Sequence, residues 1–357
     1  MNTLSYLLLN TVYKLQGERS VNGAIHLLRG KRSAQTIQDI HLFSLETYAA
    51  SLKQWPEEDI NKMVTALYRG GFLSQSNQTT LLSKKGTDWL KEAADHFELP
   101  SAFHGFNYEW DGKADYFWGR LVLTVQSVSN LVYANPSFIP VSYDRLIQQD
   151  VKSVLKAHPD RSKLGRQLYS ELKRIYEPWD EQDAALLVKR FSSNKKTGKT
   201  ISQLSGLFNH DHFYTFIYCK SLVHKMLASI SSTPDLFPVL SQLLPRIEGG
   251  PYVTQTARQT KDLLNKGFSL EEIAEKRKLK LSTIEDHVIE ISIYDPFFKI
   301  HEFLPEQERL DIIKASERLN TNRLKPIKDL FQDKYTYFQI RLALSTLRKG
   351  GNYDAAR

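Results

Sequence analysis

The sequence predicts a mainly α-helical protein in three parts: an N-terminal winged helix with a small β-hairpin wing, an all-helical middle domain and a C-terminal helix-turn-helix domain. Apolar residues recur at helical spacing through most of the 357 residues. A pair of strand-like segments interrupts them after Gly70-Gly71, and Gly267 to Val288 has the pattern of two short helices joined by a tight turn. We place the domains at residues 1–97, 98–250 and 251–357.

The first domain is expected to contain four helices, a hairpin and a closing helix. Apolar spacing and glycine stops predict the helices at 4–15, 22–29, 33–41 and 57–69. The segment FLSQSNQTTLLS predicts strands at 72–75 and 80–83 around a polar turn at 76–78. A helix at 87–95 follows. Helices followed by a small hairpin describe a winged helix.

The middle domain is expected to be almost wholly helical. Candidate helices lie at 114–133, 143–156, 164–176, 181–191, 201–208, 213–231 and 236–244. Prolines fall between these segments or at their starts, where proline is tolerated. Residues 98–115, with Pro100 and several aromatic residues, form one domain boundary, and Gly249-Gly250-Pro251 forms the other.

The segment before the helix at 201–208 resembles two known patterns. SNKKTGKT, which ends at Thr200, resembles a Walker A loop, but a helix rather than a strand precedes it and its first glycine is replaced by Ser193. An ATPase at Lys199 is therefore disfavoured, and a basic loop before a helix is the better interpretation. GKTISQLSG, from Gly198, also resembles GFSLEEIAE, from Gly267. This likeness marks either a second helix-turn-helix-like unit or only the common chemistry of a helix start, which we favour.

The C-terminal domain carries the strongest motif. Two serines are each followed three residues later by a glutamate, the spacing of a capping box: Ser269–Glu272 and Ser282–Glu285. Helices are therefore expected to begin at Leu270 and Thr283, after a helix at 254–265. Their small core is expected to consist of Leu263, Ile273, Ala274, Leu279, Leu281, Ile284 and Val288. Further helices are predicted at 305–319, 324–331 and 335–348.

Composition narrows the class of partner. The net charge of +8 is a modest excess that favours polyanionic partners. The single cysteine, Cys219, excludes an internal disulfide and a multi-cysteine zinc cluster, and we expect a buried structural thiol in a reducing cytosol. The apolar run LSYLLL is too short to span a bilayer and has no basic flank. We expect a cytoplasmic, nucleoid-associated protein with no membrane partner.

Catalytic and metal-binding patterns are absent from the sequence. His210-Asp211-His212, with His224 further on, lacks the ligands that would complete a coordination set. No G-x-S-x-G or H-E-x-x-H motif occurs. We therefore expect no enzyme activity, no cofactor, no metal and no small-molecule substrate.

The helix-turn-helix leaves a set of polar side chains outside its core. A phosphate could bind at the start of its second helix, where free backbone N–H groups and the helix dipole converge. Glu285 and Asp286 would oppose tight reading of the major groove, and small three-helix units also dock proteins. The residues expected to contact DNA are Lys276, Arg277, Lys278, Lys280, Ser282, Thr283 and His287.

Residues 4–93 resemble the RQC winged helix of RecQ and Werner-type DNA helicases. The likeness rests on HLLRGKRSAQTI, ALYRGGFLSQ and LLSKKGTDWL, which begin at His26, Ala66 and Leu81. The resemblance implies phosphate contacts from the turn after the second helix and a hairpin wing at the duplex end. Carried over by position, these contacts are Arg29, Lys31, Arg32 and Ser33, the wing tip Ser76, Asn77 and Gln78, and Lys84 and Lys85 behind it.

Two departures from that pattern bear on function. Lys31 stands where the RQC family usually has serine, and the wing tip lacks an aromatic residue that could stack on an exposed base pair. These departures argue against separation of base pairs by the wing. They are still compatible with binding to a DNA junction or to the DNA backbone.

Residues 254–349 resemble the helix-turn-helix module at the C-terminus of some of the same helicases. The likeness rests on GFSLEEIAEKRKL, STIEDHV, LKPIKDL and YFQIRLAL. The whole arrangement resembles the YpbB family of low-GC Gram-positive bacteria, whose genes lie beside a gene for a short RecQ-like helicase. The ATPase core and four-cysteine zinc site of such a helicase are absent from this sequence.

The resemblance implies a non-catalytic accessory subunit that supplies fork or junction binding to a separate RecQ-like helicase in DNA repair or recombination. Two alternatives stay open. One is a helix-turn-helix transcription regulator. The other is a helicase-binding scaffold with weak DNA contact, whose docking surface would include the aromatic residues of 106–118.

Overall fold

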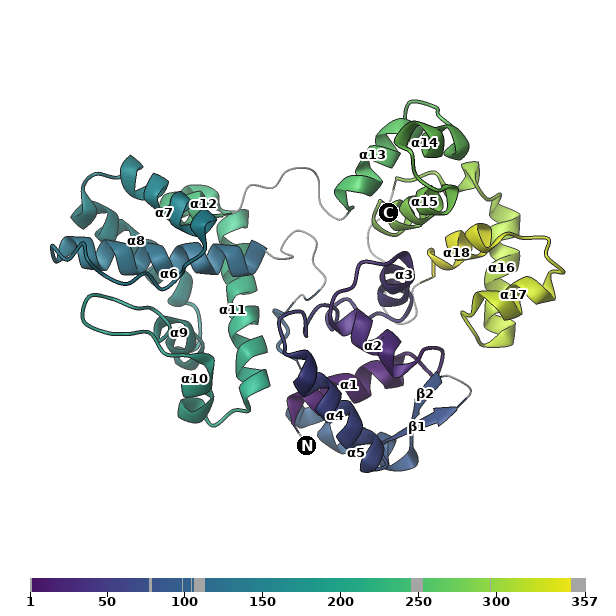
Figure 1. The fold of residues 1–357 in the computed structure, drawn as a ribbon, viewed down its shortest axis with the longest axis horizontal. Coiled ribbons are helices and arrows are strands. Elements are labelled where there is room, and N and C mark those ends of the chain that lie inside the picture. Colours follow the sequence, from purple (N-terminus) through teal and green to yellow (C-terminus); the bar gives the residue numbers. More distant parts are fainter. Residues whose placement is uncertain are drawn as a thin grey trace.

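A computed structural model of the protein describes residues 2–76, 79–97, 99–103, 105, 113–244, 253–295 and 297–347. As predicted, the protein is mainly helical with a C-terminal helix-turn-helix, and the described residues form one two-stranded antiparallel sheet. Figure 1 shows the N-terminal helices in the centre, the middle helices on one side and the C-terminal helices on the other. None of the described helices combines the length and apolar character needed to cross a membrane.

The N-terminal part has the predicted order of elements. These are α1 (Thr3–Lys14), α2 (Val21–Leu28), α3 (Ala34–Leu42), α4 (Glu57–Arg69), β1 (Leu73–Ser76), β2 (Thr79–Leu82) and α5 (Lys84–Phe97). Leu73 pairs with Leu82 in the hairpin, and Ser76 pairs with Thr79. Helix α5 begins three residues earlier than expected because the Ser83 hydroxyl accepts a hydrogen bond from the Gly86 N–H at 3.0 Å and caps the helix at that point.

Helix α1 forms the centre of the N-terminal core, in which Leu7, Leu8 and Leu9 are fully buried. Two residues of the middle domain, Phe213 and Ile217, complete this core from helix α11 (His212–Ser232). The rings of Trp55 and Phe213 lie 4.9 Å apart, edge to face. Figure 1 shows α11 as the middle helix nearest to α1 and α4. The middle domain is therefore joined to the N-terminal part by a shared hydrophobic core.

The histidine cluster considered as a metal site contributes to this junction. Asp211 caps α11 by accepting a hydrogen bond from the Tyr214 N–H, and it also accepts one from the Thr3 N–H at 3.1 Å. His212 packs against Trp55, and His224 stacks on Phe103. These side chains are occupied in capping and packing.

The middle domain contains every helix predicted for it, with ends that differ by a few residues. The other elements are α6 (Lys113–Val132), α7 (Arg145–Ala157), α8 (Arg161–Tyr176), α9 (Glu181–Val188), α10 (Ile201–Phe208), a 3₁₀ turn (Pro234–Leu236) and α12 (Pro238–Leu243). Phe117, Leu121 and Met226 are fully buried in their common core. Cys219 is buried as predicted, and burial raises the pKa of its thiol. Of the aromatic segment proposed as a docking surface, 106–112 lies outside the described residues, and Trp118 packs against Phe191.

The loop between α9 and α10 accounts for the Walker-like string. Helix α9 precedes it, as expected, and the Lys199 N–H donates to the Lys189 carbonyl at 2.8 Å. A Cβ atom on Gly198 would lie 2.1 Å from the Arg190 carbonyl oxygen. This glycine is therefore required by close backbone packing within the loop, which explains the glycine without a phosphate.

The internal likeness reflects a common chemistry of the helix start, as we favoured, and it extends through the turn that follows, so the two segments share a helix-turn-helix-like local geometry. Helix α10 and helix α14 (Leu270–Arg277) each have eight residues and begin with a capping box. Each ends in a left-handed residue, Asn209 or Lys278, and the next helix begins three residues later. The first of these units packs its second helix against the N-terminal core, so it serves as a structural joint.

Helix α12 is held at both ends by buried charged side chains. The Glu171 carboxylate accepts hydrogen bonds from the N–H groups of Val239 and Leu240, at 2.9 to 3.1 Å. At the other end the Arg120 guanidinium donates to the carbonyls of Leu243 and Leu244, at 2.8 and 3.0 Å. An anion at a helix N-terminus and a cation at its C-terminus both match the helix dipole.

Replacing Glu171 with alanine is expected to lower the free energy of unfolding of the middle domain by about 3 kcal/mol, because two buried N–H groups lose their acceptor. Glu171→Gln keeps one acceptor oxygen and should give a smaller loss. Urea unfolding followed by tryptophan fluorescence measures both. The exposed Glu177, at the end of the same helix, supplies the control Glu177→Ala, which should change stability by less than about 0.5 kcal/mol. Equal effects of the two alanine variants would contradict this assignment.

Candidate nucleic-acid interface

The helix-turn-helix is formed by α13 (Gln255–Leu264), α14 and α15 (Leu281–Tyr294). Ile273, Ala274 and Ile284 are buried where the three helices meet. The predicted capping box at Ser269 is confirmed: its hydroxyl accepts from the Glu272 N–H at 3.2 Å, and the Glu272 carboxylate accepts from the Ser269 N–H at 2.8 Å. The chain continues through a 3₁₀ turn (Ile300–Glu302), α16 (Glu306–Leu319), α17 (Leu324–Leu330) and α18 (Tyr337–Leu344).

The second predicted capping box, at Ser282, is wrong. Lys278 adopts a left-handed conformation (φ 53°), and the Leu279 N–H donates to the Ala274 carbonyl at 2.9 Å, which closes α14 and reverses the chain at once. Lys280 then becomes the N-cap of α15, without a side-chain cap. Ser282 lies inside the first turn, where its hydroxyl has no helix start to cap.

The same turn changes the expected core. Leu279 and Leu281 were predicted to be buried but are 37% and 39% exposed, because the reversal at Lys278 directs both side chains outward. Phe268 and Leu270 pack against the three-helix core instead. The apolar pattern alone could not separate these positions, since the left-handed residue breaks the helical period between them.

The basic turn presents exposed groups at the start of α15. Lys276, Lys278, Lys280 and Ser282 are exposed, and the Lys276 ammonium lies 4.8 Å from the centre of the Phe268 ring. Thr283 is half-buried, and its N–H donates to the Lys280 carbonyl at 2.9 Å. The free first-turn N–H groups are therefore those of Leu281 and Ser282, one residue before the predicted phosphate position at Ser282–Thr283. An anion there would lie beside Lys280.

Two of the predicted DNA contacts lie between α13 and α15 instead. Arg277 donates to the Thr256 carbonyl at 2.8 Å and to the Gln259 side chain at 2.9 Å. The Nδ1 atom of His287 lies 2.9 Å from the Thr260 hydroxyl. Burial lowers the pKa of the Arg277 guanidinium, and burial followed by the charge of Arg277 lowers the pKa of His287. Both side chains hold the three helices together.

The turn between α2 and α3 carries the first predicted phosphate site. Gly30 has φ +70°, and a Cβ atom there would meet the Ala50 side chain at 2.7 Å, so the turn requires glycine. Lys31 and Arg32 are exposed, and Ser33 caps α3. Arg29 lies 3.5 Å from Glu57, a solvent-accessible pair that leaves its charge only partly balanced.

The hairpin and the start of α5 carry the remaining predicted contacts. Lys84 and Lys85 are both exposed, but Lys85 donates to the Gly70 carbonyl at 2.8 Å and lies over the Phe72 ring at 4.5 Å. Ser76 ends β1, and Asn77 and Gln78 lie outside the described residues. Lys84 is therefore the better-presented cation of the two.

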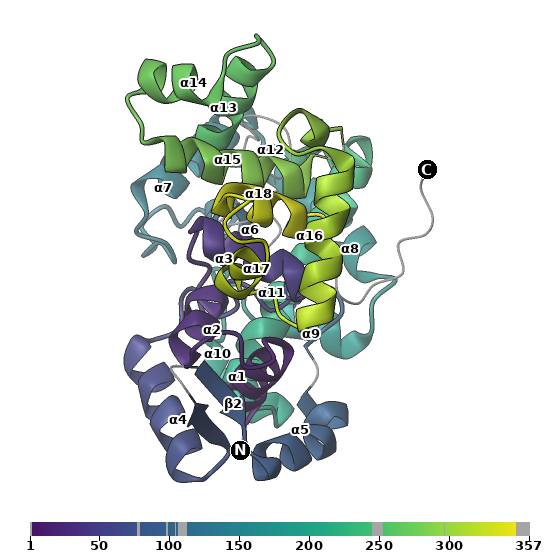
Figure 2. The same ribbon diagram turned by 90° about the vertical axis from the view of Figure 1, so that its right-hand side faces the viewer.

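Helix α3 packs along α15, and both lie beside α18, as Figures 1 and 2 show. Arg341 on α18 connects them: its guanidinium lies 2.6 Å from the Asp286 carboxylate on α15 and donates to Gln38 on α3 at 3.2 Å. The Gln38 amide in turn donates to the Arg341 carbonyl. This arrangement, which we call the α3–α15–α18 seam, pairs the charge of Asp286 with Arg341.

A buried carboxylate lies at the other end of the seam. Glu290 accepts a hydrogen bond from the Thr254 N–H at 2.6 Å, which ties α15 to the start of α13. Burial raises the pKa of Glu290, and the bonds from Thr254 and the nearby charge of Arg32 lower it. Arg32, in the predicted phosphate site of the N-terminal part, therefore lies close to the helix-turn-helix. Sequence reasoning missed Gln38, Glu290 and Arg341. Nothing in the sequence pairs Gln38 with Arg341, which lie 303 positions apart, or Glu290 with Thr254.

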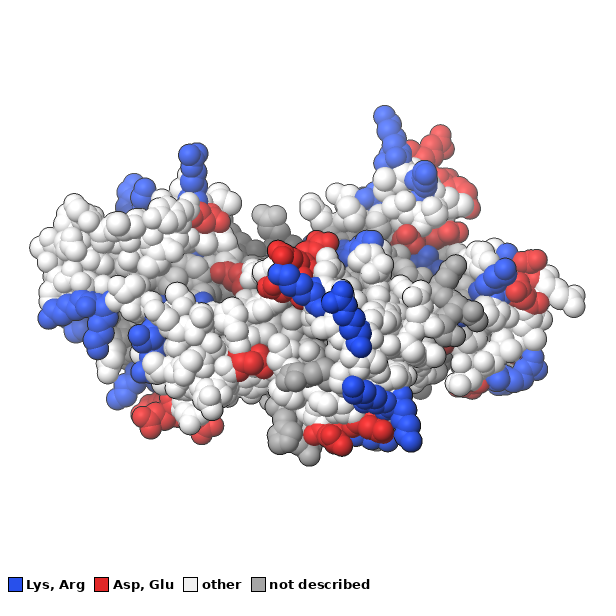
Figure 3. All heavy atoms as spheres, turned by 60° about the horizontal axis from the view of Figure 1, so that its bottom comes forward, with Lys and Arg blue, Asp and Glu red and all other residues white. Residues whose placement is uncertain are grey.

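Charge is distributed in small groups. On the face shown in Figure 3, lysine and arginine side chains form separate clusters over the N-terminal, middle and C-terminal helices, with acidic side chains between them. A single basic surface does not cover this face. DNA contact would therefore be made by local groups such as the turns at Lys31 and Lys278.

Comparison with known proteins identifies the C-terminal module. A family model described as a helix-turn-helix domain matches residues 256–344, which run from α13 to the end of α18. The chain is similar to Protein YpbB of Bacillus subtilis (strain 168), with 31% identity over 347 residues that cover 97% of each chain. No solved structure matches the chain.

His287 is expected to titrate below its ordinary pKa of 6.5, because burial and Arg277 disfavour its charged form. As the pH falls below about 6.5 the unfolded chain binds a proton that the folded chain does not bind, so the free energy of unfolding should fall. NMR titration of the His287 ring and urea unfolding at several pH values between 7.5 and 5.5 measure the two effects. His287→Gln should flatten this part of the pH dependence. A midpoint at or above 6.5 would contradict the assignment.

Proposed function

Since the chain belongs to the YpbB family, we propose that it binds DNA through its helix-turn-helix and its N-terminal winged helix, as a non-catalytic accessory subunit of a separate RecQ-like helicase. The observation that carries the DNA-binding part is the helix-turn-helix match together with exposed lysines at the turn before α15. The helicase partner, and a role in repair or recombination, follow from the family resemblance of the sequence.

The helix-turn-helix contribution rests on backbone contacts. Lys278 and Lys280 are exposed in the turn between α14 and α15, Lys278 at the chain reversal and Lys280 at the N-cap of α15. Lysine at such a position binds phosphate as a point charge and carries little sequence information. The hydrogen bonds that tie Arg277 and His287 to α13 leave few side chains that could read base edges. These features support DNA binding that depends on structure more than on sequence.

The N-terminal contribution rests on the order of elements and on one turn. Helices followed by the β1–β2 hairpin support the winged-helix assignment, and Lys31 lies exposed in the turn before α3. Lys84 supplies a second cation behind the hairpin. In this proposal the winged helix binds the DNA backbone at a junction and does not separate base pairs.

The α3–α15–α18 seam supports a preference for branched DNA. It holds the turn at Lys31 and the turn at Lys278 on one packed unit, because α3 and α15 are in direct contact. Two separate groups of cations on one body can contact two arms of a fork, whereas a single straight duplex would engage them less completely. We propose that the protein recognises a fork in this way and presents it to the helicase.

Fluorescence anisotropy with a forked DNA, a plain duplex and a single strand of matched sequence, at two salt concentrations, tests this function. We expect the fork to bind most tightly, and we expect its advantage to persist when the sequence is scrambled. Equal weak binding to all three would favour a helicase-binding scaffold. Tight binding to one duplex sequence alone would favour a transcription regulator, and either result would contradict the proposal.

Charge removal at the two turns provides a second test. Lys278→Ala with Lys280→Ala, and separately Lys31→Ala with Arg32→Ala, should each weaken fork binding uniformly across sequences. Each pair should also reduce the slope of log K against log salt by roughly two, one for each lost phosphate contact. Lys152→Ala with Lys156→Ala removes two exposed lysines of α7 and serves as the matched control. A slope that does not change, or that changes as much in the control, would remove those residues from the interface.

A further inference from the structure

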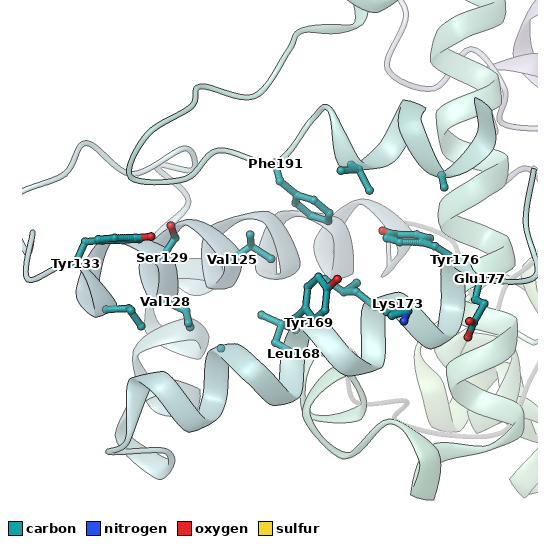
Figure 4. Close-up of a pocket in the computed structure, with 15 residues that line it drawn as sticks. Val125, Val128, Ser129, Tyr133, Leu168, Tyr169, Lys173, Tyr176, Glu177 and Phe191 are labelled. Atoms are coloured by element: carbon teal, nitrogen blue, oxygen red, sulfur yellow. The ribbon is translucent and has the colours of Figure 1, made fainter. Parts of the chain in front are cut away.

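The middle domain carries an open apolar groove of about 840 Å³ between α6, α8 and α9. Figure 4 shows side chains of α6 and α8 directed into the groove, with Phe191 on the side opposite α8. Large apolar side chains remain exposed there, with Tyr169 at 70%, Tyr133 at 57% and Val188 at 48%. Exposed apolar surface concentrated in one hollow is typical of an interaction site.

Two hydroxyl groups in the groove are already used within the chain. The Tyr176 hydroxyl donates to the Met226 sulfur at 3.7 Å, and the Ser129 hydroxyl accepts from the Asn194 N–H at 3.1 Å. A small-molecule site needs convergent polar groups that fix the orientation of the ligand. This groove instead offers a continuous apolar surface, which suits the apolar face of a helix or strand from another protein.

The shape of the groove matches a helix. Helix α8 contributes one face from Gly165 to Tyr176, a length of roughly 17 Å at 1.5 Å per residue, or about three turns. Gly165 lets α8 pack closely against α6, since a Cβ atom at this position would lie only 3.3 Å from the Val128 side chain. A groove bounded by helices and open along its length is the geometry in which an amphipathic helix binds through residues at i, i+3, i+4 and i+7.

The edges of the groove are mainly basic. Lys173 lines it, and the Lys195 ammonium lies 5.2 Å from the centre of the Tyr133 ring. Lys189 is exposed next to Val188, and Glu177 lies at the end of the groove. We propose that this groove binds an amphipathic helix of a partner protein, with aliphatic residues on its buried face and aspartate or glutamate along its edges. The inference goes beyond DNA binding and does not depend on it.

A display library tests the proposal. Peptides of about 16 residues carry a fixed leucine-rich face, with the other positions varied among acidic, basic and neutral polar residues, and are selected on the full-length protein. We expect the enriched peptides to be rich in aspartate and glutamate. Tyr169→Glu should weaken their binding by about ten-fold or more, as expected for loss of an aromatic anchor. Lys173→Glu should shift the preference toward basic peptides.

Tyr143→Glu is the matched control, because Tyr143 is 77% exposed and lies outside the groove. Circular dichroism checks the fold of each variant. Failure to enrich acidic peptides, or equal binding to the Tyr169 and Tyr143 variants, would overturn the proposal. Concentration-dependent dimers that Tyr169→Glu abolishes would assign the groove to a second copy of the chain, and loss of fork binding in that variant alone would assign it to DNA. Either result would also overturn the proposal. Fork binding by the unaltered protein is measured independently, so failure of the proposed DNA-binding function can be distinguished from failure of this inference.

Discussion

The contact between α3 and α15 is the constraint on which the proposed interface depends. The two helices lie far apart in the chain, since α3 belongs to the N-terminal part and α15 to the C-terminal helix-turn-helix. Arg341 on α18 pairs with Asp286 on α15 and donates a hydrogen bond to Gln38 on α3. Its guanidinium is largely shielded from water. Because Asp286 remains partly exposed, the ion pair adds little net stability, and its main effect is to fix the geometry of the three helices. It fixes which faces of the two modules remain exposed to solvent.

A second joint fixes the middle domain in the same manner. The α10–α11 unit repeats the local geometry of the helix-turn-helix, but Phe213 and Ile217 at the start of its second helix complete the N-terminal core. The α10–α11 unit therefore joins two domains, whereas the α14–α15 unit leaves its basic turn exposed to solvent. The groove on α6, α8 and α9 involves neither joint, so partner binding and DNA binding are assigned to separate surfaces.

The sequence predicted most of the fold because its signals are local. Helical periodicity, proline positions and the capping box at Ser269 are properties of neighbouring residues, and the structure confirms them. The failures have two causes. The left-handed conformation of Lys278 moved the start of α15, and the seam at Arg341 pairs residues that lie far apart in the chain. For the site, residue type identified the cations, but only packing separates exposed Lys278 and Lys280 from Arg277 and His287, which are tied into the helix interface.

Site-directed cleavage of a bound fork tests most directly whether both turns contact one DNA molecule. The chain has a single cysteine, Cys219, which is buried, so Lys31→Cys and Lys278→Cys can each be labelled selectively with an iron chelate that cuts nearby DNA. The account predicts cleavage of the same forked DNA from both positions, at separate places around the branch point. Cleavage from one position alone, on forks that are fully bound, would show that the two modules do not act together and would contradict the account.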